Sequence, residues 1–146
     1  MYGEISGNEA IGGILGDTVT SAGVASNSYN KGKIIANASG GGLVGGIRSK
    51  IKNCYNSGII EFKAQNDLVG GLFGGIDTNY VGKEVIENCY YLDSTADKSC
   101  GNEEALGGVE EAKAVTSEEL KSIYKDLGEE FKENKDGDMY PKLIWE

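Results

Sequence analysis

The sequence predicts an all-β fold: a parallel β-solenoid (β-helix) of about three coils of some 29 residues, followed by a C-terminal α-helix and a short strand that cap it. Three observations lead to this prediction. A glycine-rich block recurs at a fixed interval, a second short motif follows each block, and the pattern changes after residue 92 to an acidic, helix-forming one. The 146 residues are the length of one ordinary domain.

The recurring block reads Gly-Gly-apolar-apolar-Gly, and its copies start 29 residues apart. The apolar couplets are too short for helices, and each glycine between them would cost ~1 kcal/mol in a helix, so short strands separated by turns are expected. A unit of this length supplies one coil of a parallel solenoid, in which strands of successive coils pair at ~4.8 Å. The three copies are Gly12–Gly16, Gly41–Gly45 and Gly70–Gly74.

The second motif has an asparagine two residues before a tyrosine. In a stack of coils, equivalent residues lie above one another, so its asparagines are expected to bond amide to amide or to cap backbone groups at a bend. Its tyrosines are expected to pack ring over ring. The predicted ladders are Asn27, Asn53 and Asn88, and Tyr29, Tyr55 and Tyr90.

Between asparagine and tyrosine, the second and third copies carry Cys54 and Cys89 where the first has Ser28. One coil apart, these thiols would lie near the Cα separation that a disulfide requires, but a ladder of free buried thiols is favoured. Three cysteines cannot all pair within one chain. Cys100 lies in a polar segment, where it is expected to be incidental or, alternatively, to bridge.

A glycine followed by apolar residues precedes each later block, and the first such landmark, Gly3-Glu4-Ile5, stands ahead of any complete unit. The chain therefore opens partway through a unit, as a piece of a longer polypeptide would. We expect further solenoid repeats or another domain on the N-terminal side.

Residues 93–146 form the second predicted part, an acidic cap with 15 acidic and 7 basic residues. Thr116 and Glu119 match a capping box. The apolar stripe that follows predicts a helix at about 117–127, and the sequence around Pro141 predicts an edge strand at about 139–145. A cap of this kind would cover the apolar core and unpaired strand edges that the last coil exposes.

Composition excludes several classes of function. The chain has no histidine, which removes histidine-dependent catalysis, and its formal charge is −9. An acidic surface disfavours binding to nucleic acid and to anionic lipid. No apolar run is long enough for a membrane helix, so membrane insertion is not expected.

The segment GGLVGGIRSKIKNCYNSGII resembles the GLUG motif, a short repeat of large bacterial surface and secreted proteins. The resemblance covers residues 1–92 in three copies, and the closing GDMYPKLIW is similar to the segment that commonly follows the last repeat. Proteins with this motif include adhesin-like surface proteins and non-catalytic regions of bacterial proteases that cleave immunoglobulin A. The resemblance implies an extracellular, non-enzymatic spacer or adhesion module that meets a host protein or glycan.

Any ligand is expected to contact the loops of unequal length that lie between the two motifs, because these vary without disturbing the ladders. The alternative is a polysaccharide lyase or hydrolase, since parallel β-helices often carry such sites. Asp17 and Asp77 would then be the carboxylates, although two coils should separate them by ~10 Å. The candidate contact residues are Asp17, Thr18, Arg48, Lys50, Lys52, Asp77, Asn79 and Tyr80.

No cofactor is expected. Gly40, Gly42 and Gly45 fit the spacing of a dinucleotide-binding loop, but such a loop occurs once, between a strand and a helix, whereas this block recurs. Asn134, Asp136 and Asp138 alternate as in a calcium loop, yet no bidentate glutamate closes it, so an Asx-type turn is favoured and no metal is assigned.

Overall fold

The computed structural model describes residues 3–18, 23–63, 68–77, 79, 86–103 and 111–146. Strands make up 48% of the structure and helices 11%, and the four main sheets are parallel throughout. The predicted all-β class is therefore confirmed.

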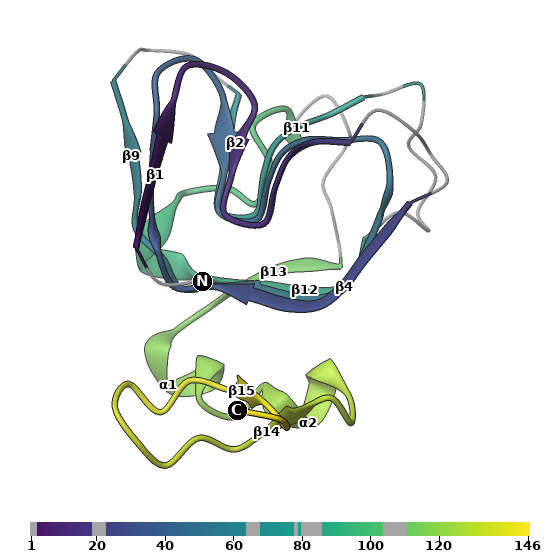
Figure 1. The fold of residues 1–146 in the computed structure, drawn as a ribbon, viewed down its shortest axis with the longest axis vertical. Helices are drawn as coiled ribbons and strands as arrows, with labels where there is room; N and C mark the ends of the chain where they lie inside the picture. The colour runs from purple at the N-terminus through teal and green to yellow at the C-terminus, as the bar shows by residue number, and fades with distance from the viewer. Residues whose placement is uncertain (1–2, 19–22, 64–67, 78, 80–85, 104–110) are drawn as a thin grey trace.

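Each of the first three repeats contributes one strand to each of four parallel sheets, and we call each set of four consecutive strands a tier. Figure 1 views the tiers almost end-on, so that equivalent strands superimpose. The first tier holds β1 (Glu4–Gly7), β2 (Ile11–Gly12), β3 (Leu15–Asp17) and β4 (Val24–Asn30). The second holds β5 (Lys33–Ala36), β6 (Gly40–Gly41), β7 (Val44–Ile47) and β8 (Lys50–Asn56). The third holds β9 (Ile60–Phe62), β10 (Val69–Gly70), β11 (Phe73–Ile76) and β12 (Ile86–Leu92).

The strand register places equivalent residues of the repeats side by side. Cys54 of β8 pairs with Ser28 of β4 on one side and with Cys89 of β12 on the other. Val44 of β7 likewise lies between Leu15 and Phe73. Each repeated motif is thus a column that runs across the tiers.

The stack extends past the predicted boundary at residue 92. After the 3-10 turn η2 (Asp93–Thr95), Cys100 forms a parallel bridge with Phe73. The strand β13 (Ala112–Val115) then pairs with β12 in parallel. These two pieces form a fourth, incomplete tier within the residues predicted to belong to the cap.

The asparagine column occupies the one residue that the pairing register skips in the middle of β4, β8 and β12. Asn27, Asn53 and Asn88 all have a left-handed backbone, with φ of 50°, 52° and 50°, a conformation that asparagine tolerates better than most residues. The Asn53 amide donates to the Asn27 side-chain oxygen at 3.2 Å, and the Asn88 amide donates to that of Asn53 at 3.3 Å.

The interior of the stack is filled by apolar side chains that come from two columns of strands. Leu43, Leu72 and Phe73 are fully buried there, and the thiols of Cys54 and Cys89 join the same cluster from the opposite sheet. Every cysteine is free and buried. Burial raises the pKa of Cys100 to about 11.

Residues 116–146, which we call the C-terminal unit, contain α1 (Ser117–Leu120), α2 (Tyr124–Leu127), β14 (Phe131–Lys132) and β15 (Lys142–Leu143). This unit was expected to cover the end of the stack. Figure 1 shows it instead beside the tiers, on the outer face of the sheet that contains β4, β12 and β13. The reason is the tyrosine column, which points outward and needs an apolar cover.

The rings of Tyr29 and Tyr55 stack with centroids 5.1 Å apart and an interplanar angle of 9°. Tyr90 lies in register with Tyr55 and belongs to the same cluster. The buried side chains of Leu120 and Leu127 pack against this column. Tyr29 donates its hydroxyl to the Glu146 carboxylate, and Tyr55 donates to the Pro141 carbonyl.

The predicted capping box is confirmed: the Thr116 hydroxyl accepts from the Glu119 backbone N–H, and the Glu119 carboxylate accepts from the Thr116 backbone N–H. The helix predicted at about 117–127 is instead two single turns. Ser122 lies between them and donates its hydroxyl to the Glu119 carbonyl at 2.9 Å, a side-chain bond that competes with helical backbone bonds.

The strand predicted at about 139–145 is also shorter, and only Lys142–Leu143 pairs, antiparallel to β14. Met139 has a left-handed φ of 61°, which departs from the extended backbone of a strand, and the Asp138 carboxylate accepts from the Tyr140 backbone N–H. None of the helices in the described parts of the chain is long and apolar enough to span a membrane.

Candidate functional site

A groove with a volume of about 350 Å³ opens where each tier bends inward at its glycine-rich block. Figure 1 shows this bend between β2 and β11. The groove crosses every tier of the stack, so each tier contributes residues to its lining. The lining residues are Ala10, Asp17, Ser39, Gly45, Gly46, Ile47, Arg48, Leu68, Gly75, Ile76, Asp77 and Asn102.

The inward bend requires glycine because the backbones of neighbouring tiers come into contact there. A Cβ on Gly45 would lie 2.0 Å from the carbonyl carbon of Ala10, and one on Gly42 would lie 2.3 Å from the backbone carbonyl oxygen of Gly71 and equally close to the side chain of Asn56. The side chains of Asn30 and Tyr91 likewise lie where a Cβ on Gly13 or on Gly71 would be. The block predicted from the sequence thus allows close packing, and the exposed side of its bend forms the groove floor.

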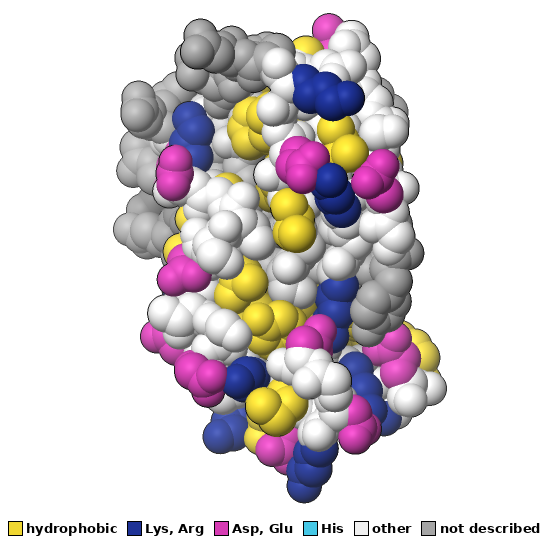
Figure 2. Space-filling model, turned by 90° about the vertical axis from the view of Figure 1, so that its left-hand side faces the viewer, with side chains coloured by type: hydrophobic (Ala, Val, Ile, Leu, Met, Phe, Trp, Pro, Cys, Tyr) yellow, Lys and Arg dark blue, Asp and Glu magenta, His cyan; other side chains and the backbone are white. Residues whose placement is uncertain are grey.

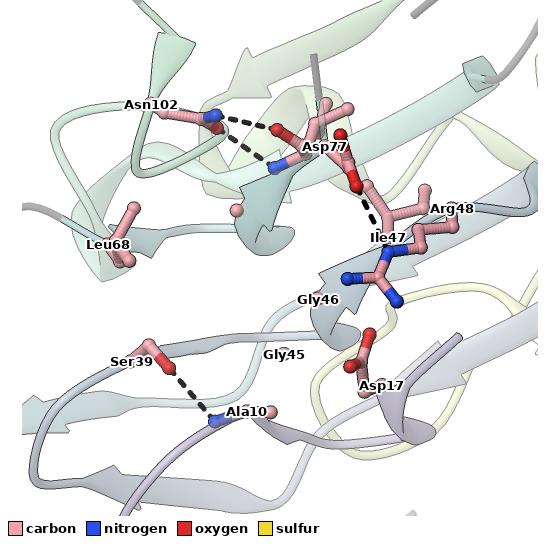
Figure 3. Close-up of a pocket in the computed structure, with 12 residues that line it drawn as sticks. Ala10, Asp17, Ser39, Gly45, Gly46, Ile47, Arg48, Leu68, Asp77 and Asn102 are labelled. Atoms are coloured by element: carbon pink, nitrogen blue, oxygen red, sulfur yellow. Dashed lines mark hydrogen bonds and ion pairs between the residues drawn. The ribbon is translucent and has the colours of Figure 1, made fainter. Parts of the chain in front are cut away.

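One wall of the groove carries three charged side chains, one from each of the first three tiers (Figure 3). Arg48, just after β7, donates from Nε to the Asp77 carboxylate at 3.2 Å. Asp17 of β3 lies on the other side of the guanidinium, and its carboxylate lies over Gly46, where a Cβ would come within 2.8 Å of it. The wall therefore presents a guanidinium between two carboxylates.

The Asp77 carboxylate is held by several donors. Its Oδ1 accepts from both the backbone N–H and the side-chain amide of Asn79, each at 3.0 Å. These bonds, led by the backbone N–H of Asn79 and reinforced by Arg48, lower the pKa of Asp77 below its usual value. Asp77 is thus an anionic anchor that fixes the orientation of Arg48.

The far end of the groove is closed by Asn102 of the fourth tier. Its side chain donates to the Ile76 carbonyl at 2.7 Å and accepts from the Ile76 backbone N–H at 2.9 Å, in place of a further strand. At the opposite wall the Ser39 hydroxyl accepts from the backbone N–H of Ala10 at 2.9 Å. Leu68, 40% exposed, is the apolar side chain of that wall.

The predicted contact residues separate into two groups. Asp17, Arg48 and Asp77 line the groove, and Asn79 orients Asp77. Thr18 is buried: it accepts from the Arg48 backbone N–H and donates to the Gly46 carbonyl. Its role is structural. Tyr80 lies outside the described residues.

Lys50 and Lys52 were predicted to be contact residues together with Arg48, but the structure places the two lysines elsewhere. Both lysines lie on β8 and pair with Glu87 of the next tier, at 3.4 Å and 2.8 Å. The hydrogen bond from Lys52 is the largest cause that lowers the pKa of Glu87. On the face shown in Figure 2, Lys and Arg side chains likewise mix with Asp and Glu, and hydrophobic side chains gather where the tiers meet the C-terminal unit.

Asp17 and Asp77, the carboxylates of the alternative enzyme site, do not face each other. Asp17 and Asp77 lie two tiers apart with Arg48 between them (Figure 3), whereas hydrolysis needs two carboxylates that flank one bond. Within the described residues, no three Asp, Glu or Cys side chains gather to hold a metal ion. The Asn134 side chain accepts from the Asp136 backbone N–H, which is an Asx-type turn.

Several groove residues were not identified from the sequence. Leu68 and Gly75 flank the third glycine block and lie 29 residues after Ser39 and Gly46, so the repeat was the available signal for them. Asn102 lies beyond the last complete repeat, and only the fold brings it to the groove. The buried pair Asn30 and Asn56 was also missed as a ladder: the amide of Asn30 donates to Asn56 at 3.0 Å. Their shared position after the repeated tyrosine was the available signal.

No protein-family model matches the chain, and comparisons with curated proteins and with solved structures likewise give no match.

Proposed function

We propose that the chain is a non-enzymatic structural and adhesion module of a bacterial surface protein, built as a β-solenoid. The observation that carries this proposal is the in-register pairing of β4, β8 and β12, which makes each repeat one tier of a continuous stack. In such a stack each repeat contacts only its neighbours, and a rigid elongated face results.

Side chains link the tiers in addition to the backbone. The Asn27–Asn53–Asn88 ladder spans three tiers, and Lys33 pairs with Glu61 of the next tier at 2.7 Å. Exposed ion pairs contribute little individually, but regular links between tiers favour a single register. This regularity is suited to holding a binding surface at a fixed distance from its anchor.

The first tier supports the expectation of further repeats on its outer side. Among the described residues, β1 to β4 each have a strand neighbour on one side only. Ile5, Ile11 and Ile14 of this tier are only partly buried, whereas their equivalents in the second tier, such as Ile34 and Leu43, are fully buried. Another tier with the same motifs would cover these side chains and pair with this edge.

The resemblance of the repeats to the GLUG motif supports the bacterial, extracellular setting. The groove supports an adhesive role over a purely structural one, because it exposes a charged side chain from each of the first three tiers. The arrangement of Asp17 and Asp77 on opposite sides of Arg48 favours binding over glycoside hydrolysis.

A glycan and host-protein array tests the proposal, with each polysaccharide that binds then assayed for depolymerisation. A lyase would create an unsaturated product that absorbs ultraviolet light, and a hydrolase would release reducing ends. Binding without either product is the expected result. Turnover would contradict the proposal in favour of a carbohydrate-active enzyme. If the chain bound to no spot on the array, the adhesive role would be rejected and only the structural role would stand.

A further inference from the structure

We propose that the groove binds an uncharged, hydroxyl-rich ligand, a neutral saccharide, through the Arg48 guanidinium and the Asp17 carboxylate. The inference deepens the adhesive role proposed above and rests on it. It assigns the site and the chemical class of the ligand.

Arg48 is oriented for such a ligand before binding. Its Nε donates to Asp77, which Asn79 holds in turn, so the plane of the guanidinium is fixed. Within the described part of the chain, its two Nη groups have no hydrogen-bond partner, and the side chain is 38% exposed. Because the guanidinium is already oriented, its Nη–H donors lose little conformational entropy when they bind hydroxyl oxygens.

Asp17 supplies acceptors on the same wall. Its side chain is exposed, and no other described residue bonds to its carboxylate. It lies over Gly46 on the side of Arg48 that faces away from Asp77 (Figure 3). Two adjacent hydroxyls of a sugar fit this arrangement, because one can accept from the guanidinium while the other donates to the carboxylate.

The floor of the groove allows a ring to approach closely. Gly45, Gly46 and Gly75 line it without side chains of their own; Ala10 lies against Gly45 and the Asp17 carboxylate over Gly46, so Gly75 is the open position. Leu68 faces this floor from the opposite wall, and a Cβ on Gly75 would lie 3.6 Å from it. The C–H face of a saccharide would therefore contact glycine and leucine while its hydroxyls reach the polar wall.

Local charge excludes the two ionic alternatives. Arg48 lies between Asp17 and Asp77, so this wall carries a formal charge of −1 on a chain of −9, which repels an anion. A cation would meet the guanidinium, and Asp77 already accepts three hydrogen bonds from Arg48 and Asn79. An uncharged ligand with both donors and acceptors remains.

An extended peptide fits the floor less well. β6 and β7 are paired with strands on both sides, and Asn102 occupies the backbone groups of Ile76 at the end of β11, so a peptide could not add there by main-chain hydrogen bonds. The charged side chains of the groove lie on one wall. Their contacts match the separate hydroxyls of a sugar better than a continuous peptide backbone.

The test is an NMR titration of the whole chain with cellotetraose, maltotetraose, mannotetraose and chitotetraose, each at up to about 10 mM, which detects even millimolar affinity. Oligogalacturonate and a mixed-sequence peptide library serve as anionic and peptide comparisons. We expect at least one neutral oligosaccharide to shift the amide signals of Gly45, Gly46 and Gly75 and the Arg48 Nε–H signal.

Variants then identify the contacts. Arg48→Ala is expected to weaken binding about 10- to 100-fold, because hydrogen bonds to a charged group are lost. Arg48→Lys keeps the charge and can still pair with Asp77, but it lacks the two Nη groups of the guanidinium, so it should also weaken binding. Lys52→Ala, outside the groove and paired with Glu87, is the matched control and should leave affinity unchanged.

A second pair of variants tests the floor without removing a charge. Gly75→Ala places a methyl group in the groove at an ordinary contact distance, so the fold should tolerate it while the ligand loses its close approach. Gly23→Ala, where the nearest atom is 3.4 Å away in Ser49, adds the same methyl group outside the groove. Only the first is expected to weaken binding.

The inference is overturned if no neutral probe shifts the groove signals, if only oligogalacturonate or peptide binds, or if Arg48→Ala and Gly75→Ala bind as the unmodified chain does. The array and the titration separate the two proposals. Binding on the array that these variants leave unchanged would reject the groove and keep the adhesive function. Absence of binding in both would reject the adhesive function itself.

Discussion

The stacked tiers and the C-terminal unit are stabilised in different ways. In the tiers, backbones approach so closely that glycine is required, and each residue lies beside its equivalent in the next repeat. In the C-terminal unit, short helices and strands pack apolar side chains against a column of tyrosines, without repetition. Repetition thus fixes the register of the tiers, while ordinary side-chain packing holds the second region in place.

The largest effect should come from breaking backbone contact between tiers. Gly45→Ala would place a Cβ 2.0 Å from the Ala10 carbonyl carbon, so the first and second tiers would have to separate. We expect a loss of about 4 kcal/mol or more in the free energy of unfolding, measured by urea denaturation. Gly75→Ala is the control, because its methyl group meets only ordinary contacts, and it should change stability by less than about 0.5 kcal/mol. Equal effects of the two variants would contradict the close approach.

Matched leucine truncations should distinguish the two regions. Leu43 lies inside the tiers and Leu127 in the C-terminal unit, and both are fully buried. Each change to alanine should cost about 3 kcal/mol through lost burial and the remaining cavity. Hydrogen exchange is the informative measurement: Leu127→Ala should raise exchange mainly within residues 116–146, whereas Leu43→Ala should raise it across the tiers. If Leu127→Ala raised hydrogen exchange equally in the tiers and in the C-terminal unit, the two regions would form one cooperative unit.

Alkaline pH should weaken the tiers, because the buried thiol of Cys100 lies there. Burial raises the pKa of Cys100 from 9.0 to about 11, so the folded state favours the neutral thiol. This contribution is fully present below pH 9 and is lost as pH rises through 11; a shift of this size corresponds to roughly 2–3 kcal/mol. Unfolding free energies from pH 8 to 11.5 should therefore fall less steeply for Cys100→Ala than for the unmodified chain. Identical slopes would rule out this contribution.

The smallest effect concerns the start of the C-terminal unit. Thr116→Ala removes the hydroxyl that accepts from the Glu119 backbone N–H, and loss of such a cap costs about 1 kcal/mol. Because the cap belongs to the side-chain-packed region, exchange should increase around α1 while the tiers stay protected. Thr116→Ser, which keeps the hydroxyl, is the control and should restore most of the protection.

The repeats made much of the tier region predictable. The 29-residue spacing and the Asn-x-Tyr motif indicated parallel strands in register, and a fixed spacing says which residues are neighbours even when they are far apart in sequence. The fourth tier was missed because Cys100 and Ala112 keep the register without keeping the motifs. Backbone pairing in a parallel sheet does not require a particular side chain.

The C-terminal unit shows what local patterns leave open. The capping box was evident at Thr116 and Glu119, but nothing local indicated that the tyrosine column faces outward and takes this unit as its cover. Likewise, Arg48, Lys50 and Lys52 were predicted together as contact residues, and only the fold places Arg48 at the groove and both lysines beside Glu87. The chain turns between β7 and β8, so Arg48 and Lys50 lie on different parts of the surface although they are two residues apart.

The most direct test of the account is a set of nuclear Overhauser contacts between neighbouring tiers. The in-register stack predicts backbone contacts between Ser28 and Cys54 and between Cys54 and Cys89, together with ring contacts between Tyr29 and Tyr55 within one molecule. Contacts displaced by one residue, or contacts found only between molecules, would contradict the tiers. Both the groove and its proposed ligand would then have to be abandoned.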